Sequence, residues 1–192
     1  KRDSDIVETP QAVAGQNIRP RGMDFTAGRL LLEKGRRLDG VALALAAASG
    51  AATLSVTRRP RVAILTGGDE LAEPGSAPAP FQIFDSGTRG VAASLEQWGA
   101  LPNRLKLEKD DVDAIARAAG EALAQNDLLV VIGGASVGDH DHARPALKKL
   151  GLQLAVEKVA LRPGKPTWFG RTPLGPVLGL PGNPASALVC AP

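Results

Sequence analysis

An uninterrupted apolar run is the feature that most restricts what this chain can fold into. Residues 128–132 read Leu-Leu-Val-Val-Ile, and the glycine pair Gly133-Gly134 follows directly. A strand with one wet face would alternate apolar and polar residues, whereas a fully apolar run is typical of a strand covered on both faces. Such strands occur in parallel sheets that carry helices on either side. The run therefore predicts an α/β protein.

The segments around this run alternate between strand and helix patterns. We expect strands at residues 62–65, 103–107, 128–132, 153–160, 167–169 and 176–180, and helices at residues 86–98, 112–124 and 144–150. Ser86 and Asp110 or Asp111 are the expected helix caps. A turn at residues 172–175 joins the last two strands as a hairpin. The alternation predicts a mostly parallel sheet with helices on both faces.

The first part of the chain has a different character. We expect a helix at residues 41–48, capped by Asp39, and a strand at residues 53–57. The predicted division is a small β-containing element with one short helix at residues 1–60, and an α/β domain at residues 61–192. Because the chain starts with Lys1 and stops shortly after opening a new helix, we expect it to be a piece of a longer protein.

Composition excludes several classes of protein. The net charge is only +3, basic residues are scattered, and aromatic residues make up 3%, so a nucleic-acid surface is not expected. The single cysteine excludes an internal disulfide and, with two histidines, leaves no zinc cluster. No apolar stretch reaches the roughly 18 residues of a membrane span, and no signal peptide opens the chain. We expect a cytoplasmic protein that binds neither nucleic acid nor membrane.

A tight turn near the end predicts an anion site. Residues 179–186 read Gly-Leu-Pro-Gly-Asn-Pro-Ala-Ser, with Asn183 at a helix cap and Pro184 at the first helical position. The first N–H groups of a helix have no partner inside it, and its dipole favours negative charge there. We expect these groups to face a ligand anion.

Two more glycine-rich loops follow predicted strands. One reads Thr66-Gly67-Gly68-Asp69-Glu70, and the other runs from Gly133 to Gly138 with Ser136 inside it. Three such loops at the carboxyl ends of strands predict a pocket for a phosphorylated ligand. The alternative for the Gly133-Gly134 pair is an ordinary strand-to-helix turn. Neither a Walker loop nor a Gly-x-Gly-x-x-Gly motif is present.

Charged residues near these loops suggest chemistry. Arg162-Pro163-Gly164-Lys165-Pro166 holds two cations on a stiff loop, which favours phosphate or oxyanion binding. Glu70 and the aspartates of Asp139-His140-Asp141-His142 could hold Mg²⁺ with water and phosphate. Solvated loop residues remain the alternative for the two histidines, and helix capping alone could explain Asp110-Asp111.

Taken together in this order, the motifs resemble the molybdopterin molybdenumtransferase family, the MoeA type that includes the gephyrin E domain. The resemblance covers most of residues 61–192, with a further similar segment at residues 15–24. It rests on Thr66-Gly67-Gly68-Asp69-Glu70-Leu71, Ile83-Phe84-Asp85-Ser86, Asp110-Asp111, the loop from Gly133 to Asp141, Pro163-Gly164-Lys165-Pro166, and Gly179 to Ser186.

The resemblance implies a three-layer α/β/α sandwich of the MogA/MoaB kind. It implies insertion of molybdate into adenylylated molybdopterin with Mg²⁺-dependent release of AMP, in a protein that is a homodimer at full length. By position, the implied catalytic residues are Glu70, Asp111, Asp141 and Lys165, with Glu70 and Asp141 as metal ligands. The implied binding residues are Gly67, Gly68, Asp85, Ser86, Gly133, Gly134, Ser136, Gly138, Arg162, Pro181, Gly182, Asn183, Pro184 and Ser186.

Three departures from the family pattern leave alternatives open. Gly67 stands where the family has threonine, Gly87 where it has asparagine, and Arg162 where it has lysine. The first two remove hydrogen-bonding side chains, so a binding-only relative without transferase turnover is one alternative. A MogA-like molybdopterin adenylyltransferase is another, although such enzymes carry a different loop after the glycine pair.

Overall fold

The structure is a computed structural model that describes residues 2–3, 6–7, 13–68, 70–106, 111–133 and 142–191. It divides into two compact units, Lys1–Val56 and Thr57–Pro192. No helix of the described residues is long and apolar enough to cross a membrane.

The first unit holds little regular structure. Two short antiparallel strands, β1 (Arg2–Asp3) and β2 (Ile6–Val7), precede helix α1 (Gly40–Ala48). The Asp39 side chain caps α1 by accepting the N–H of Ala42 at 2.7 Å, which confirms the predicted helix start. The predicted strand at residues 53–57 is wrong, because no described segment pairs with its backbone groups.

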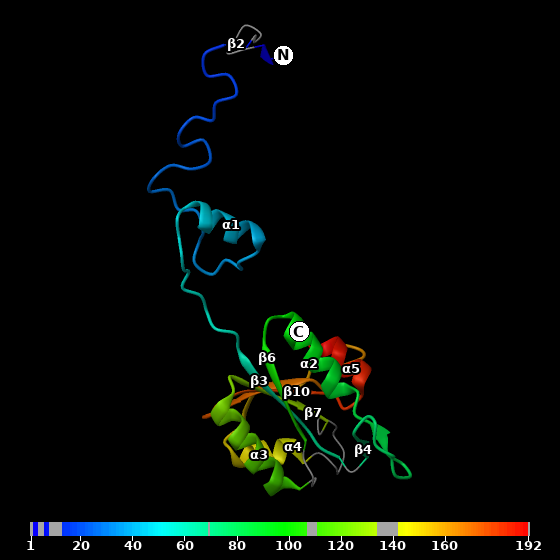
Figure 1. The fold of residues 1–192 in the computed structure, drawn as a ribbon. Coiled ribbons are helices and arrows are strands. Elements are labelled where there is room, and N and C mark those ends of the chain that lie inside the picture. The colour runs from blue at the N-terminus through cyan, green and yellow to red at the C-terminus, as the bar shows by residue number, and fades with distance from the viewer. Residues whose placement is uncertain are drawn as a thin grey trace. The chain divides into compact units, whose positions relative to one another are not determined.

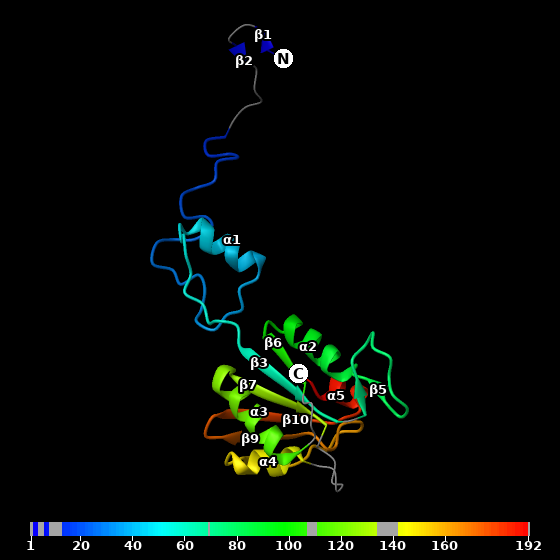
Figure 2. The ribbon, with the colours of Figure 1, turned by 60° about the horizontal axis from the view of Figure 1, so that its bottom comes forward.

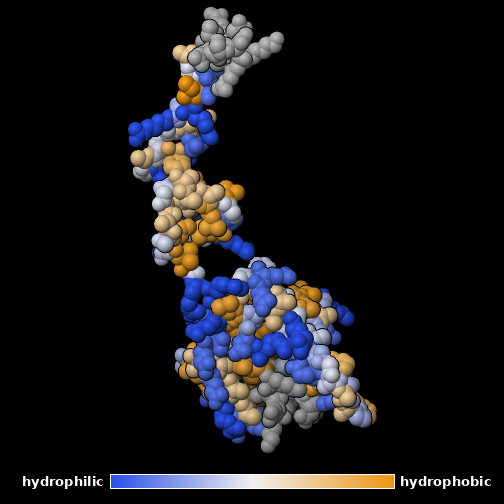
Figure 3. Space-filling view, viewed as in Figure 1, coloured by the Kyte–Doolittle hydropathy of each residue, from blue (hydrophilic) through white to orange (hydrophobic). Residues whose placement is uncertain are grey.

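Most of the α1 surface is apolar and open. Only Ala42 and Ala46 are buried, while Val41 and Leu43 are 72% and 52% exposed. Figure 3 shows hydrophobic colour over the segment that carries this helix. Tertiary packing inside this unit therefore covers only a narrow stripe of the helix.

The second unit is built on a six-stranded sheet in the order β6-β3-β7-β10-β9-β8 (Figures 1 and 2). Its strands are β3 (Arg61–Thr66), β6 (Leu101–Lys106), β7 (Leu128–Ile132), β8 (Gln153–Val156), β9 (Trp168–Thr172) and β10 (Gly175–Leu180). The first four strands in the sheet order run parallel, and β9 pairs antiparallel with both β10 and β8. The predicted mostly parallel sheet and the terminal hairpin are confirmed.

Helices cover both faces of this sheet. They are α2 (Gly87–Gln97), α3 (Val112–Gln125), α4 (Ala143–Lys149) and α5 (Pro184–Cys190). Figure 2 shows α3 and α4 on one side and α2 and α5 on the other. The three-layer α/β/α arrangement expected from the resemblance is therefore present.

The apolar residues of the central strand β7 pack alternately into two separate hydrophobic cores. Leu129 and Val131 of β7 pack with α3 and α4, while Val130 and Ile132 pack with α2 and α5. Successive side chains of a strand point to opposite faces, so a strand with helices on both sides needs apolar residues throughout. This requirement explains the uninterrupted apolar run.

Several element boundaries differ from the predicted ones. The strand predicted at 153–160 ends at Val156, and α2 begins at Gly87, as expected after a cap at residue 86. Two short strands, β4 (Leu71–Ala72) and β5 (Ile83–Phe84), were not predicted. They pair in parallel across an intervening loop, and two residues are too few to show a periodic pattern.

Trp168 makes one glycine of β10 indispensable. The Trp168 side chain is fully buried opposite Gly179, and a Cβ on Gly179 would lie 1.9 Å from the indole Cε2. The indole therefore occupies the space that any side chain at position 179 would need.

We expect Gly179→Ala to lower the free energy of unfolding by about 2–3 kcal/mol, because the buried ring has no room to move aside. Urea titration followed by tryptophan fluorescence measures this change. Gly120→Ala in α3 is the matched control: its Cβ would meet Leu150 Cδ2 at an ordinary 3.8 Å, and alanine favours the helix by about 0.5–1 kcal/mol. Equal stability of the two variants would contradict the packing argument.

Asp127 ties the start of β3 to the segment that precedes β7. Its carboxylate accepts two hydrogen bonds from the Arg58 guanidinium, one of 2.7 Å, and a third from the Arg61 N–H at 2.8 Å. The hydrogen bonds from Arg58, then that from Arg61, lower the pKa of Asp127 to about 2.

This low pKa predicts a pH-dependent contribution to stability. An aspartate in the unfolded chain has a pKa of 3.8, so the carboxylate stabilises the fold above that pH and loses its effect as the pH falls towards 2. We expect Asp127→Asn to be less stable than the unmodified chain at pH 7. The two should converge between pH 4 and pH 2 in urea titrations, and a constant difference across that window would contradict the assignment.

Candidate active site

The ends of five strands meet at one edge of the large sheet. Parallel pairing places the last residues of β3, β6, β7 and β10 side by side, with Thr66 opposite both Lys106 and Ile132. β9 runs the other way, and its first residue, Trp168, lies opposite Gly179. The segment before β9 therefore joins the same edge as the loops that follow the parallel strands.

A pocket of about 110 Å³ opens at this edge, and we call it the carboxylate pocket. Its described lining comes from the loops after β3, β7 and β10, from β5, and from the start of α2. The lining residues are Thr66, Gly67, Glu70, Leu71, Ile83, Phe84, Asp85, Ser86, Gly87, Ile132, Gly133, Gly182 and Pro184. Glu70 and Asp85 are acidic, and no lysine or arginine is among these described residues.

The β4–β5 pair brings Glu70 into the pocket. The Ile83 N–H donates to the Glu70 carbonyl at 2.7 Å, and the Leu71 N–H donates to the Gly68 carbonyl at 3.0 Å. Gly68 has a φ of +137°, and the Glu70 carboxylate lies where a Cβ at position 68 would stand. This tight turn therefore needs glycine at position 68 and sets the carboxylate against the backbone.

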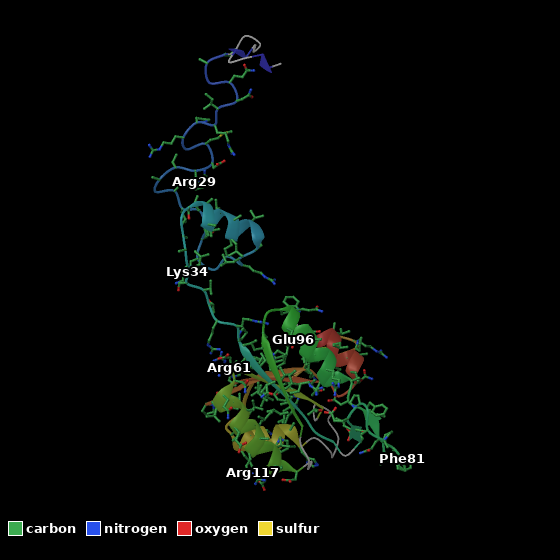
Figure 4. All side chains as sticks on the ribbon, in the orientation of Figure 1. Arg29, Lys34, Arg61, Phe81, Glu96 and Arg117 are labelled. Atoms are coloured by element: carbon green, nitrogen blue, oxygen red, sulfur yellow. The ribbon has the colours of Figure 1, made fainter. Side chains whose placement is uncertain are left out.

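The loop between β4 and β5 extends away from the sheet. Phe81 lies at its tip and is 99% exposed, and Figure 4 shows the labelled side chain beyond the body of the unit. Ile83 and Phe84 are exposed as well, but both line the carboxylate pocket. The lining of this pocket therefore combines exposed apolar side chains with two acids.

Asp85 rather than Ser86 caps α2 through its side chain. The Thr88 N–H donates to Asp85 Oδ1 at 3.1 Å, and the Thr88 hydroxyl donates to Asp85 Oδ2. Ser86 stands at the cap position but makes no capping hydrogen bond through its side chain. The predicted cap position at Ser86 is confirmed, but the side chain that accepts the free N–H is that of the adjacent Asp85.

Close backbone contact forms the floor of the carboxylate pocket. A Cβ on Gly182 would lie 3.4 Å from the Gly133 Cα, and the Gly133 N–H donates to the Leu180 carbonyl at 3.2 Å. Gly87 is less restricted, since a Cβ there would meet Ile132 Cγ2 at an ordinary 3.7 Å. Packing therefore brings the backbones at positions 182 and 133 close together, but it does not by itself require glycine at position 182 or at position 87.

A second pocket of about 390 Å³ lies in the segment that precedes β9, and we call it the cationic pocket. Its described lining consists of Lys158, Val159, Ala160, Leu161, Arg162 and Lys165. Two backbone hydrogen bonds close the loop: the Val159 N–H donates to Lys165 O at 3.2 Å, and the Thr167 N–H donates to Gly164 O at 2.9 Å. Three cations thus surround one hollow.

Lys158 is a candidate residue that sequence reasoning missed. The sequence pattern assigned Lys158 to a strand at 153–160, in which we expected no role for its side chain in ligand binding. Because β8 ends at Val156, Lys158 belongs to the loop. Its place four residues before Arg162 was the available signal.

The start of α5 satisfies its own helix N–H groups in part. Asn183 Oδ1 accepts the Ser186 N–H at 3.2 Å, and Pro184 occupies the first turn, so the predicted cap is confirmed. Asn183, Ser186 and Pro181 do not appear among the described lining of either pocket. One of the N–H groups expected to face an anion, that of Ser186, is therefore engaged by Asn183.

Asp111 has a visible structural task. Its Oδ1 accepts the N–H groups of Asp113 and Ala114, both at 2.9 Å, and caps α3. It follows β6 at the same edge of the sheet but is absent from the described lining of both pockets. The alternative that Asp111 serves as a helix cap is confirmed.

Four predicted site residues lie outside the described residues: Gly134, Ser136, Gly138 and Asp141. Among the described residues, no group of three acids, histidines or cysteines could hold a metal ion. The predicted pairing of Glu70 with Asp141 around Mg²⁺ therefore stays a prediction.

Known proteins match most of this chain in sequence. Residues 63–192 match the family described as "Probable molybdopterin binding domain". The chain is 38% identical to a molybdopterin molybdenumtransferase of Nostoc over 187 residues, and 39% identical to one of Haemophilus influenzae over 187 residues. These matches cover 96% and 97% of this chain but only 42% and 46% of the relatives. The chain thus spans less than half the length of these relatives.

A solved structure agrees with the sequence matches. The molybdopterin biosynthesis MoeA protein of Pyrococcus horikoshii superposes with a TM-score of 0.73 at 32% identity, over 88% of this chain and 43% of that one. The family expected from the motifs is confirmed. This chain belongs to the molybdopterin binding domain family, as found in molybdopterin molybdenumtransferases.

Proposed function

We propose that this chain binds adenylylated molybdopterin at the carboxyl edge of its sheet. Within the whole protein, it would serve the insertion of molybdate with release of AMP. The observation that carries this proposal is the pair of oppositely charged pockets at one sheet edge, together with the names of the relatives.

The charge of each pocket suits a different part of such a ligand. A pterin ring presents N–H groups, from which the carboxylate of Asp85 can accept hydrogen bonds. Phosphate and molybdate are anions, which Lys158, Arg162 and Lys165 attract and hydrogen-bond. Because the carboxylate pocket is smaller than the roughly 300–1,000 Å³ that encloses a whole small-molecule ligand, it would hold only one end of the substrate.

Among the described residues, we assign direct roles in the reaction to Glu70 and Lys165. Glu70 is exposed in its pocket with a carboxylate of the kind that Mg²⁺ prefers, so it would be a ligand of that ion, and Asp141 is proposed as a second. Bound Mg²⁺ would neutralise phosphate charge. Lys165 and Arg162 would hold the anion in place. We further propose that the full-length protein is a cytoplasmic homodimer.

One structural feature favours the alternative of a binding-only relative without transferase turnover. Gly67 and Gly87 both line the carboxylate pocket without contributing a side chain. A binding-only relative would use the same pockets, so binding alone does not separate the two functions.

Calorimetry with adenylylated molybdopterin, followed by an AMP-release assay with molybdate and Mg²⁺, tests the proposal. The protein tested should be both this chain and the full-length protein that contains it. Binding with AMP release by the full-length protein supports the transferase. Binding without release leaves the binding-only alternative, and no binding by either protein overturns both.

We expect Lys158→Met to weaken binding of adenylylated molybdopterin about tenfold, since a charge-assisted hydrogen bond to phosphate is lost. Calorimetry at low and high salt measures the loss, which should shrink as salt screens the cation. Lys148→Met on the exposed face of α4 removes the same charge outside both described linings and serves as the control. Equal effects of the two substitutions would mean that only net charge matters.

A further inference from the structure

A polar network behind the carboxylate pocket joins Asp85 to the sheet. Asp85 lines the pocket, but both of its carboxylate oxygens are tied to Thr88 on the first turn of α2. Thr88 is only 1% exposed. The direction in which Asp85 presents its remaining lone pairs therefore depends on this buried residue.

Arg104 of β6 forms a hydrogen bond with Thr88. Its Nη1 donates to Thr88 Oγ1 at 3.4 Å. A guanidinium can only donate, so the threonine oxygen must accept this bond, and the hydroxyl hydrogen is left for Asp85. The chemistry of the three groups thus allows one order of donors, from Arg104 through Thr88 to Asp85.

Glu73 holds the other end of the network. Arg104 Nη2 lies 3.7 Å from Glu73 Oε1, and Arg89 Nη2 lies 2.8 Å from Glu73 Oε2. Both arginines therefore share one acid, but of the two only Arg104 has a hydrogen bond to Thr88 recorded in the described part of the chain. This difference makes Arg89 a matched control for Arg104.

We propose that Thr88 and Arg104 are positioning residues for ligand binding, which act through Asp85 and do not touch the ligand. Each oxygen of Asp85 accepts from Thr88 and keeps one further acceptor site for N–H groups of the ligand. Fixing the carboxylate before binding removes the cost of ordering it later. This inference rests on the proposed function, because Asp85 is counted there among the binding residues.

The test is a double-mutant cycle on the full 192-residue chain, with calorimetry against adenylylated molybdopterin. Thr88→Val keeps the shape and removes the hydroxyl, and it should weaken binding about fivefold to tenfold, the usual worth of one hydrogen bond. Thr88→Ser keeps the hydroxyl and should restore affinity to within about twofold. Asp85→Asn alone should weaken binding about tenfold.

Coupling between the two positions distinguishes positioning from a general structural role. In the Asp85→Asn background, Thr88→Val should have almost no further effect on affinity, because Thr88 would have lost the group it positions. Arg104→Met should weaken binding about threefold, while Arg89→Met should change it by less than about twofold. If Thr88→Val fails to fold, the two arginine variants decide the question, because the side chains of Arg104 and Arg89 are 29% and 49% exposed and neither is part of the buried core.

Several results would overturn the inference. Equal losses for Thr88→Val with and without Asp85→Asn would show that Thr88 acts by another route. Unchanged affinity in Asp85→Asn, with Lys158→Met still weakened, would remove the role of the network but leave the proposed function. Unchanged affinity in Thr88→Val, with Asp85→Asn weakened, would do the same. No binding by either the unmodified chain or the full-length protein would overturn the proposed function, and the role of the network with it.

Discussion

Parallel pairing of β3 with β7, and of β7 with β10, is the constraint on which the second unit depends. It buries β7 on both faces, so neighbouring residues such as Val130 and Val131 enter different cores. Each fully buried aliphatic side chain contributes about 1.5–3 kcal/mol. Parallel strands also need a crossover on each connection, which places helices on both faces and brings every loop of interest to one edge.

That edge separates two kinds of charge. The loops after β7 and β10 approach each other at Gly133 and Gly182, and the pocket beside them has two acids in its described lining, while the segment before β9 carries three cations on a closed loop. Because β9 runs antiparallel to β10, it starts at the edge of the sheet where the parallel strands end. The cationic segment before β9 therefore lies at the same edge as the loops that carry the acids.

Features that depend on neighbouring residues could be predicted from the sequence, whereas those that depend on pairing between distant segments could not. Asn183 and Pro184 carry a cap signal within four residues, and the apolar run at β7 specifies burial by itself. The β4–β5 pair joins residues twelve positions apart with two residues each, so no periodicity announces it. Whether Asp85 or Ser86 accepts the capping hydrogen bond depends on the direction of their side chains, which the sequence does not specify. Lys158 lines the cationic pocket because β8 ends at Val156, before the predicted end of that strand.

Helix α5 links the two pockets physically. Pro184, at its first position, lines the carboxylate pocket, and Cys190, at its last, places its sulfur 3.7 Å from the Gly164 carbonyl of the cationic loop. Gly164 has a φ of +127°, and a Cβ there would lie 2.1 Å from the Cys190 Sγ. The cationic loop can therefore adopt its shape only where position 164 lacks a side chain and position 190 carries a small one. Packing of one seven-residue helix thus sets the geometry on both sides of the site.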